Sequence, residues 1–297
     1  WGARWRDWIR SCGLGGAFPG HPLGRAMVWP AVRQYIEPMI QGGKLHWPTL
    51  CRVCHRWQGQ TICAHCTLAA GVEAPRCRRC AMRATLAHGL CQPCEDNPPV
   101  FDHAVAALDY ALPWTSLIAS LKFRQDPAVA RSLAQLLAQA VRRRWGPRQP
   151  AAPDGMRPAV PTRLRAGAPT VLMPVPLSPQ RLRERGYNQA GLLAHHLSRA
   201  LGVPVQHDGL LRRRHTERLM QMDAAEREAH IRRAFAVNPA SLKHVQRRHV
   251  AVVDDVLTSG ATLNEIARTL WQAGAAEVSV WVVARTSQLE TCRIDTP

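Results

Sequence analysis

The 297-residue sequence has no long apolar run and shows no export signal. The best candidate for a membrane span, residues 104–121, contains Asp109 and Pro113, whereas a transmembrane helix needs about 20 consecutive apolar residues. The N-terminal region has arginines but no apolar stretch followed by a small-residue cleavage site. We therefore expect no transmembrane segment and a cytoplasmic location. With 46% hydrophobic residues, the composition also excludes wholesale disorder and a fibrous protein.

Acidic residues and lysines are scarce. Only 21 Asp and Glu oppose 39 Lys and Arg, giving a net charge of +18, and the only lysines are Lys44, Lys122 and Lys243. Such a charge indicates a nucleic acid or another anionic partner. The excess is, however, nearly uniform along the chain, at +7, +6 and +5 for residues 1–100, 101–170 and 171–297. The positive charge therefore has two competing explanations. One is a compositional bias of the genome, and the other is local phosphate binding by arginine clusters.

The first 47 residues are predicted to form an N-terminal extension that is artefactual before Met27, because the chain starts at Trp1. A competing interpretation rests on Trp1, Trp5 and Trp8, which would lie on one face of a short basic helix. Such a helix binds membrane surfaces. This second interpretation predicts that the protein attaches peripherally to the inner face of the cell membrane.

Eight of the ten cysteines form four Cys-x-x-Cys pairs, separated by eight, ten and ten residues. Two such pairs supply the four thiolates of a tetrahedral zinc site, which has no open position and is therefore structural. Two zinc ions are predicted, with neighbouring pairs or interleaved pairs sharing an ion. Disulfides and iron-sulfur clusters are the competing interpretations. The predicted ligands are Cys51, Cys54, Cys63, Cys66, Cys77, Cys80, Cys91 and Cys94.

Strands and helices alternate from residue 101 onward, which predicts an α/β domain with a mostly parallel sheet covered by helices on both faces. A segment with six prolines and three glycines, residues 146–169, is predicted to be a loop. Apolar periodicity predicts helices over 115–123, 129–144, 188–201 and 263–274, strands over 103–111, 170–175, 250–253 and 277–284, and a loop over 254–261.

The segment VAVVDDVLTSGAT (250–262) has the pattern of a ligand site. A buried strand brings Asp254 and Asp255 to its carboxyl end, where open α/β sheets bind ligands. A short turn with hydroxyl groups then leads into a helix, and such a turn binds phosphate. Because carboxylates repel phosphate, they must serve sugar hydroxyls or Mg²⁺. Together these features predict a sugar phosphate ligand.

VVDDVLTSGAT resembles the phosphoribosyl pyrophosphate motif of type I phosphoribosyltransferases. Four further features make the chain similar to the ComF-type competence family over about residues 50–287. They are a double zinc ribbon, YALPWTSLIASLKFRQD (110–126), PVPLSPQRLRERGYNQAGLLA (174–194) and RRHTERLMQMDAAEREAHIRRAF (213–235). The resemblance implies a double zinc ribbon over 48–97 and a phosphoribosyltransferase-like domain over 101–297.

The resemblance also implies roles for individual residues. Asp254 and Asp255 would contact the ribose hydroxyls, directly or through Mg²⁺, and pyrophosphate would lie at residues 176–178 near Arg185. The arginine-rich segment 212–233 would cover the site, with Leu219 and His230 standing where the family usually has Gln and Asn. The residues expected to hold the 5-phosphate are Thr258, Ser259, Gly260, Ala261 and Thr262.

Three functions are compatible with these residues. The first is a phosphoribosyltransferase that uses phosphoribosyl pyrophosphate and Mg²⁺, acts on an unidentified acceptor, and serves DNA uptake or DNA utilisation. The second is a non-catalytic component of DNA uptake that binds single-stranded DNA and DNA-uptake proteins, although aromatic stacking residues are sparse in the basic stretches. The third is a sensor of phosphoribosyl pyrophosphate that signals through the zinc domain.

Overall fold

The computed structural model describes residues 40–41, 44–45, 49–58, 60–70, 74–83, 88–124, 126–146, 164–213 and 233–287. The predictions on the N-terminal helix and Met27, on most of the loop at 146–169, and on Leu219 and His230 lie outside these residues. The chain divides into two compact units, one of residues 1–51 and 55–61 and the other of residues 52–54 and 62–297.

The first unit contains two short antiparallel strand pairs. Strand β1 (Ile40–Gln41) pairs with β2 (Lys44–Leu45), and β3 (Thr49–Leu50) pairs with β4 (Trp57–Gln58). Between β3 and β4 the backbone forms a tight turn, in which the Cys51 N–H donates to the Arg56 carbonyl at 2.8 Å.

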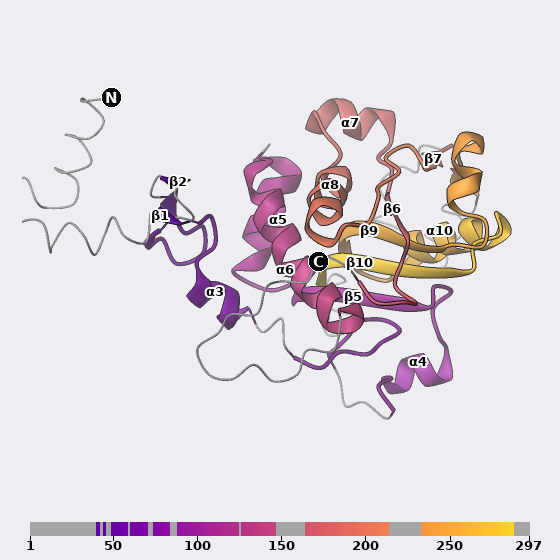
Figure 1. The fold of residues 1–297 in the computed structure, drawn as a ribbon, viewed down its shortest axis with the longest axis horizontal. Coiled ribbons are helices and arrows are strands. Elements are labelled where there is room, and N and C mark those ends of the chain that lie inside the picture. The colour runs from indigo at the N-terminus through magenta and orange to yellow at the C-terminus, as the bar shows by residue number, and fades with distance from the viewer. Residues whose placement is uncertain are drawn as a thin grey trace, which may run out of the picture. The chain divides into compact units, whose positions relative to one another are not determined.

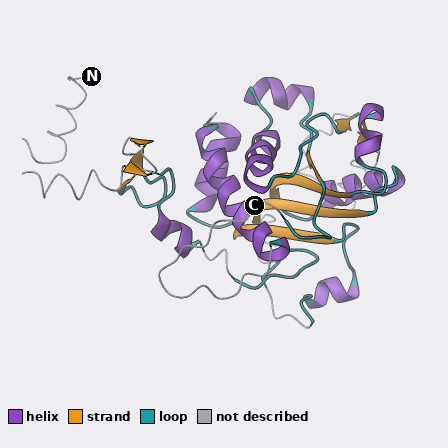
Figure 2. Ribbon diagram, in the orientation of Figure 1, coloured by secondary structure: helices purple, strands orange, loops and turns teal. Residues whose placement is uncertain are grey.

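The second unit is built on a four-stranded parallel sheet in the order β5-β10-β9-β6 (Figures 1 and 2). Its inner strands read as almost continuous apolar runs, as expected for strands buried on both faces. The sequence prediction of a mostly parallel α/β sheet is therefore confirmed. The strands are β5 (His103–Asp109), β6 (Val171–Pro174), β9 (His249–Leu257) and β10 (Glu277–Arg285).

Helices cover both faces of this sheet (Figure 2). On one face, Trp145 at the end of α6 lies 5.9 Å from the Trp281 ring of β10. On the other face, Val280 and Val282 belong to the apolar core that includes Ile266 of α10, because alternate residues of a strand face opposite ways. The helices are α5 (Trp114–Phe123), α6 (Ala128–Trp145), α7 (Pro179–Arg185), α8 (Gln189–Leu201) and α10 (Ala261–Gln272).

Smaller elements complete the described part of the second unit. An antiparallel pair joins β7 (Leu210–Arg212) to β8 (Phe235–Val237), and a 3-10 helix, η3 (Pro239–His244), follows it. Two short helices, α3 (Ala64–Ala69) and α4 (Gln92–Asp96), accompany the cysteines. No helix among the described residues combines the length and apolarity needed to cross a membrane.

One element boundary differs from the sequence prediction in a way that affects the candidate site. The predicted loop over 254–261 was wrong, because β9 continues to Leu257 and α10 begins at Ala261. Backbone pairing with β10 continues past the two carboxylates, with Asp254 opposite Val282. The connecting turn is therefore only three residues long, and both aspartates lie within a strand.

Candidate functional site

The turn between β9 and α10 presents hydroxyl groups and free backbone N–H groups. Thr258 and Ser259 are exposed, and Gly260 has φ +84°, a conformation that suits glycine. The first helical hydrogen bond runs from the Asn264 N–H to the Gly260 carbonyl at 2.8 Å, and no described side chain caps this end of α10. The N–H groups of its first turn are therefore available to an anion.

Asp254 and Asp255 have different surroundings, because successive strand residues point to opposite faces of the sheet. Asp255 is 4% exposed, and its Oδ1 lies 2.7 Å from the Nζ of Lys122 in α5. Its Oδ2 is buried without a hydrogen-bond partner among the described residues. Asp254 accepts a hydrogen bond from the Asp255 N–H at 2.8 Å.

Electrostatics set Asp254 apart as a carboxylate that is costly to ionise. Burial and then the charge of Asp255 raise the pKa of Asp254 to about 7, against the opposing effects of Lys122 and Arg185. A cation or a hydroxyl donor beside Asp254 would favour its charged form. Binding of such a group would therefore lower the pKa of Asp254.

Arg185 lies close to this carboxylate pair. It occupies the last turn of α7, and its guanidinium carbon is 5.3 Å from the centre of the Phe123 ring. Burial lowers the pKa of Arg185, while the charges of Asp255 and Asp254 act in the opposite direction. Helix α7 begins where the Ser178 hydroxyl accepts the Arg181 N–H at 3.3 Å. The connection from β6 to α7 thus lies at the same sheet edge as the β9 turn, since the two strands are parallel.

The structure thus brings most of the predicted ligand-binding residues to one edge of the sheet. It also adds Lys122. The contact of this lysine with Asp255 was not predicted from the sequence. The available signal was the rarity of lysine in this chain, because Lys122 is one of three. The covering segment falls largely outside the described residues, at 214–232.

The cysteines form two groups of four, and each group consists of neighbouring Cys-x-x-Cys pairs. Within each group all ligand atoms lie within 4.8 Å of one another, and none of these eight described cysteines is in a disulfide. Two sulfur-to-sulfur distances are 3.7 Å (Cys54 to Cys63) and 3.6 Å (Cys80 to Cys91). Four sulfurs bound tetrahedrally at about 2.3 Å from one zinc ion lie about 3.8 Å apart, so the groups fit two structural zinc ions.

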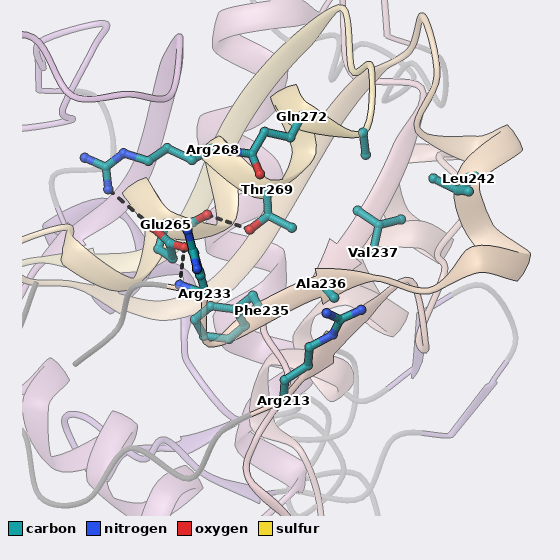
Figure 3. A pocket seen from close by; sticks show the side chains of 11 residues that line it. Arg213, Arg233, Phe235, Ala236, Val237, Leu242, Glu265, Arg268, Thr269 and Gln272 are labelled. Atoms are coloured by element: carbon teal, nitrogen blue, oxygen red, sulfur yellow. Dashed lines mark hydrogen bonds and ion pairs between the residues drawn. The ribbon is translucent and has the colours of Figure 1, made fainter. Parts of the chain in front are cut away.

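A separate pocket of about 720 Å³ lies between β8 and α10 (Figure 3). Its floor includes the buried carboxylate of Glu265, which accepts the Arg233 N–H at 2.7 Å and pairs with Arg268 at 3.5 Å. Arg213 and Arg233 lie at its rim next to the undescribed segment 214–232. The pocket includes none of the predicted ligand-binding residues. Its lining is Arg213, Arg233, Phe235, Ala236, Val237, Leu242, Glu265, Arg268, Thr269, Gln272 and Ala273.

Several known proteins resemble this chain over most of its length. The DNA utilization protein YhgH of Escherichia coli K12 is 33% identical over 248 residues, a match that covers 80% of this chain and 98% of the relative. The chain belongs to the ComF/YhgH family. Competence protein F of Haemophilus influenzae is 34% identical over 211 residues, covering 71% of this ComF/YhgH chain and 85% of the relative. The resemblance inferred from the sequence motifs is thus confirmed.

Other similarities of this ComF/YhgH protein are partial. Competence protein ComFC of Bacillus subtilis is 32% identical over 120 residues, or 39% of this chain and 45% of that protein. No family model matches the chain. Among solved structures, the glutamine phosphoribosylpyrophosphate amidotransferase of Bacillus subtilis is 22% identical with a TM-score of 0.33, covering 56% of this chain and 30% of that one. A similarity at this level adds nothing to the sheet topology described above.

Proposed function

We propose that this protein binds phosphoribosyl pyrophosphate with Mg²⁺ at the carboxyl edge of its sheet and transfers the phosphoribosyl group to an acceptor, in DNA uptake or DNA utilisation. One observation carries the proposal. Two adjacent carboxylates lie near the carboxyl end of a parallel strand, and a three-residue hydroxyl-bearing turn leads from this strand into a helix that has no side-chain cap among the described residues. The biological setting comes from the names of the relatives, DNA utilization protein and competence protein.

The turn supports the phosphate half of the ligand. Thr258, Ser259 and Thr262 supply hydroxyls, and the first turn of α10 supplies N–H groups at the positive end of the helix dipole. A phosphate needs this combination of donors, and nothing in the turn repels it. We therefore assign the 5-phosphate to this turn.

The carboxylates support the sugar and the metal ion. Carboxylate oxygen is the ligand that Mg²⁺ prefers, the pKa of Asp254 is raised to about 7, and Asp255 has one oxygen without a partner among the described residues. A hard cation beside Asp254, or ribose hydroxyls that donate to it, would favour the charged form of this carboxylate. When bound, Mg²⁺ would neutralise negative charge on the pyrophosphate.

The proposed reaction exchanges one bond at the anomeric carbon for another. The bond from this carbon to the pyrophosphate oxygen breaks, its electron pair leaves with pyrophosphate, and the acceptor supplies the pair for the new bond. The chain's residues contribute by positioning the two partners. Lys122 holds Asp255 at 2.7 Å, and Arg185 lies near both carboxylates, where it would attract the departing anion.

Calorimetric titration with phosphoribosyl pyrophosphate and Mg²⁺ tests this function. We expect saturable, Mg²⁺-dependent binding to the wild-type protein and loss of binding in an Asp254→Ala, Asp255→Ala double variant. Asp208→Ala, which removes an exposed carboxylate elsewhere, is the control and should bind normally. Equal affinity in the double variant and the wild type would refute the site.

The second candidate function, a non-catalytic DNA-binding component, is favoured by the net charge of +18 and by the names of the relatives. It predicts that affinity for a single-stranded oligonucleotide falls steeply as salt rises, because binding to phosphates releases counterions. Titration of the oligonucleotide at two salt concentrations distinguishes it from the first candidate. Salt-sensitive DNA binding without any binding of phosphoribosyl pyrophosphate would favour this second function.

A further inference from the structure

The second cysteine group is attached to the sheet that carries the candidate site. The Arg78 carbonyl, between two ligand cysteines, accepts the backbone N–H of Ala104 in β5 at 3.0 Å. The Arg76 guanidinium lies 2.7 Å from the Asp109 carboxylate at the end of the same strand. This knuckle, residues 77–80, therefore has a fixed position on the edge strand of the sheet.

Arg285, the last residue of β10, joins this knuckle to the turn after β9. Its Nε donates to the carbonyl of Cys80 at 3.1 Å. Its Nη1 lies 3.0 Å from the Leu257 carbonyl and 2.8 Å from the Thr258 carbonyl, and it also contacts the carbonyl and hydroxyl of Thr286 at 2.9 and 3.0 Å. One guanidinium therefore spans a metal-ligand residue and the first residue of the predicted phosphate-binding turn.

A second link joins the same two regions. The backbone N–H of Val100, just after the second cysteine group, donates to the Asn264 side chain at 2.9 Å. Asn264 lies in the first turn of α10, and its own N–H donates to the Gly260 carbonyl at 2.8 Å. The chain leaving the metal group thus holds one end of the turn, while Arg285 holds the other.

The chemistry of the group makes this link dependent on the metal. Four thiolates carry more negative charge than one divalent ion, so a positive group beside them is stabilising, and Arg285 supplies it. Without an ion, four thiols within 4.8 Å of one another lose the bonds that fix their knuckles. The Cys80 carbonyl then loses its fixed position, and with it Arg285 loses one anchor.

We infer that Arg285 is a positioning residue through which the second four-cysteine metal group holds the turn of Thr258, Ser259 and Gly260 in its ligand-binding conformation. This gives the second group a role in ligand binding beyond stabilising its own knuckles. The part of the inference that concerns ligand affinity rests on the proposed function, whereas the part that concerns the order of the turn does not.

The test compares matched variants of the full chain. Cys94→Ser removes one ligand of the second group, and Cys66→Ser makes the same change in the first group as the control. Arg285→Ala removes the link with both cysteine groups intact, and Arg285→Lys keeps the charge but loses the planar fork that reaches two carbonyls at once. Elemental analysis counts zinc, and far-UV circular dichroism establishes that each variant is folded.

Hydrogen exchange of the backbone amides at 257–264 is the readout that needs no ligand. We expect exchange about tenfold faster in Cys94→Ser and Arg285→Ala, corresponding to freer local opening, an intermediate rate in Arg285→Lys, and the wild-type rate in Cys66→Ser. Arg285→Ala should still hold two zinc ions. An unchanged rate at 257–264 in a folded Cys94→Ser variant that has lost its zinc would overturn the inference.

Titration of the same variants with phosphoribosyl pyrophosphate and Mg²⁺ tests the consequence for affinity. We expect Kd to rise about tenfold in Cys94→Ser and in Arg285→Ala, with little further rise when both changes are combined, because coupled residues are not additive. Fully additive losses would mean that Arg285 does not act through the metal group. Absence of binding to the wild type would refute the proposed function, and the exchange rates would still decide the inference.

Discussion

At the scale of single residues, the candidate site depends on carboxylates held in unequal surroundings. Asp255 is buried and paired with Lys122 at 2.7 Å. Asp254 has no such lysine of its own among the described residues, and its pKa is raised to about 7 by burial and by Asp255. The protein without ligand therefore accommodates a charge at Asp254 poorly, and perturbed pKa values of this kind are common at functional sites.

Asp254→Asn should therefore stabilise the ligand-free protein while abolishing binding of phosphoribosyl pyrophosphate. An unfolded aspartate titrates near pH 3.9, so stability contributed by the protonated side chain is lost as pH rises from about 4 to about 7. At pH 8 the melting temperature of the variant should be higher than that of the wild type by at least about 2–4 °C. This is the shift that about 1 kcal/mol produces in a domain of this size. Little difference is expected at pH 4. A variant less stable than wild type at pH 8 would contradict this account.

At the scale of elements, sequence patterns predicted the long helices and inner strands but not every boundary. Helix α6 and strand β10 were found because their apolar periodicity is long and unbroken. Helix α7 was missed because seven residues, with no buried side chain, show no apolar period. The carboxyl half of β9 was missed because Asp254 and Asp255 are atypical strand residues, and only pairing with β10 keeps them extended.

The same limit applies to the site. Spacing predicted that the eight cysteines bind metal, but only the fold brings the sulfurs of neighbouring pairs close enough to bind one ion. The motif itself predicted Asp254, Asp255 and the turn that follows. The contacts of Lys122 and Arg285 join segments far apart in the chain, so no local pattern could reveal them.

Gly260 permits an element-scale prediction, because its φ of +84° places it in a region that costs other residues about 1–2 kcal/mol. A Cβ there would meet Leu257 and Asn264 at ordinary distances of 3.6 and 3.9 Å, so Gly260→Ala should act through the backbone alone. Gly167→Ala is the control, since Gly167 has φ +83° and open space around it. Both variants should lose similar stability in thermal unfolding, but only Gly260→Ala should weaken ligand binding in titration. Equal ligand affinity in the two variants would argue against the turn as the phosphate site.

At the scale of the whole molecule, the net charge of +18 is weaker evidence for a nucleic acid or another anionic partner than its size alone would indicate. Arginines of the second cysteine group face acidic partners on the sheet, as Arg76 and Arg83 do around Asp109 at 2.7 and 2.8 Å. Other arginines donate to carbonyl groups, as Arg285 does. Part of the positive charge therefore holds the second cysteine group to the sheet and is committed to internal contacts.

The metal content itself provides the final prediction. The purified protein should contain two zinc ions per chain by elemental analysis, because two complete four-cysteine groups are present, and Cys66→Ser and Cys94→Ser should each contain one. Chelation should release both ions and expose the eight thiols to a thiol reagent. The parallel sheet has its own apolar core, so most far-UV circular dichroism should survive the loss of zinc. Iron in place of zinc, or thiols that stay unreactive after chelation, would refute two structural zinc sites.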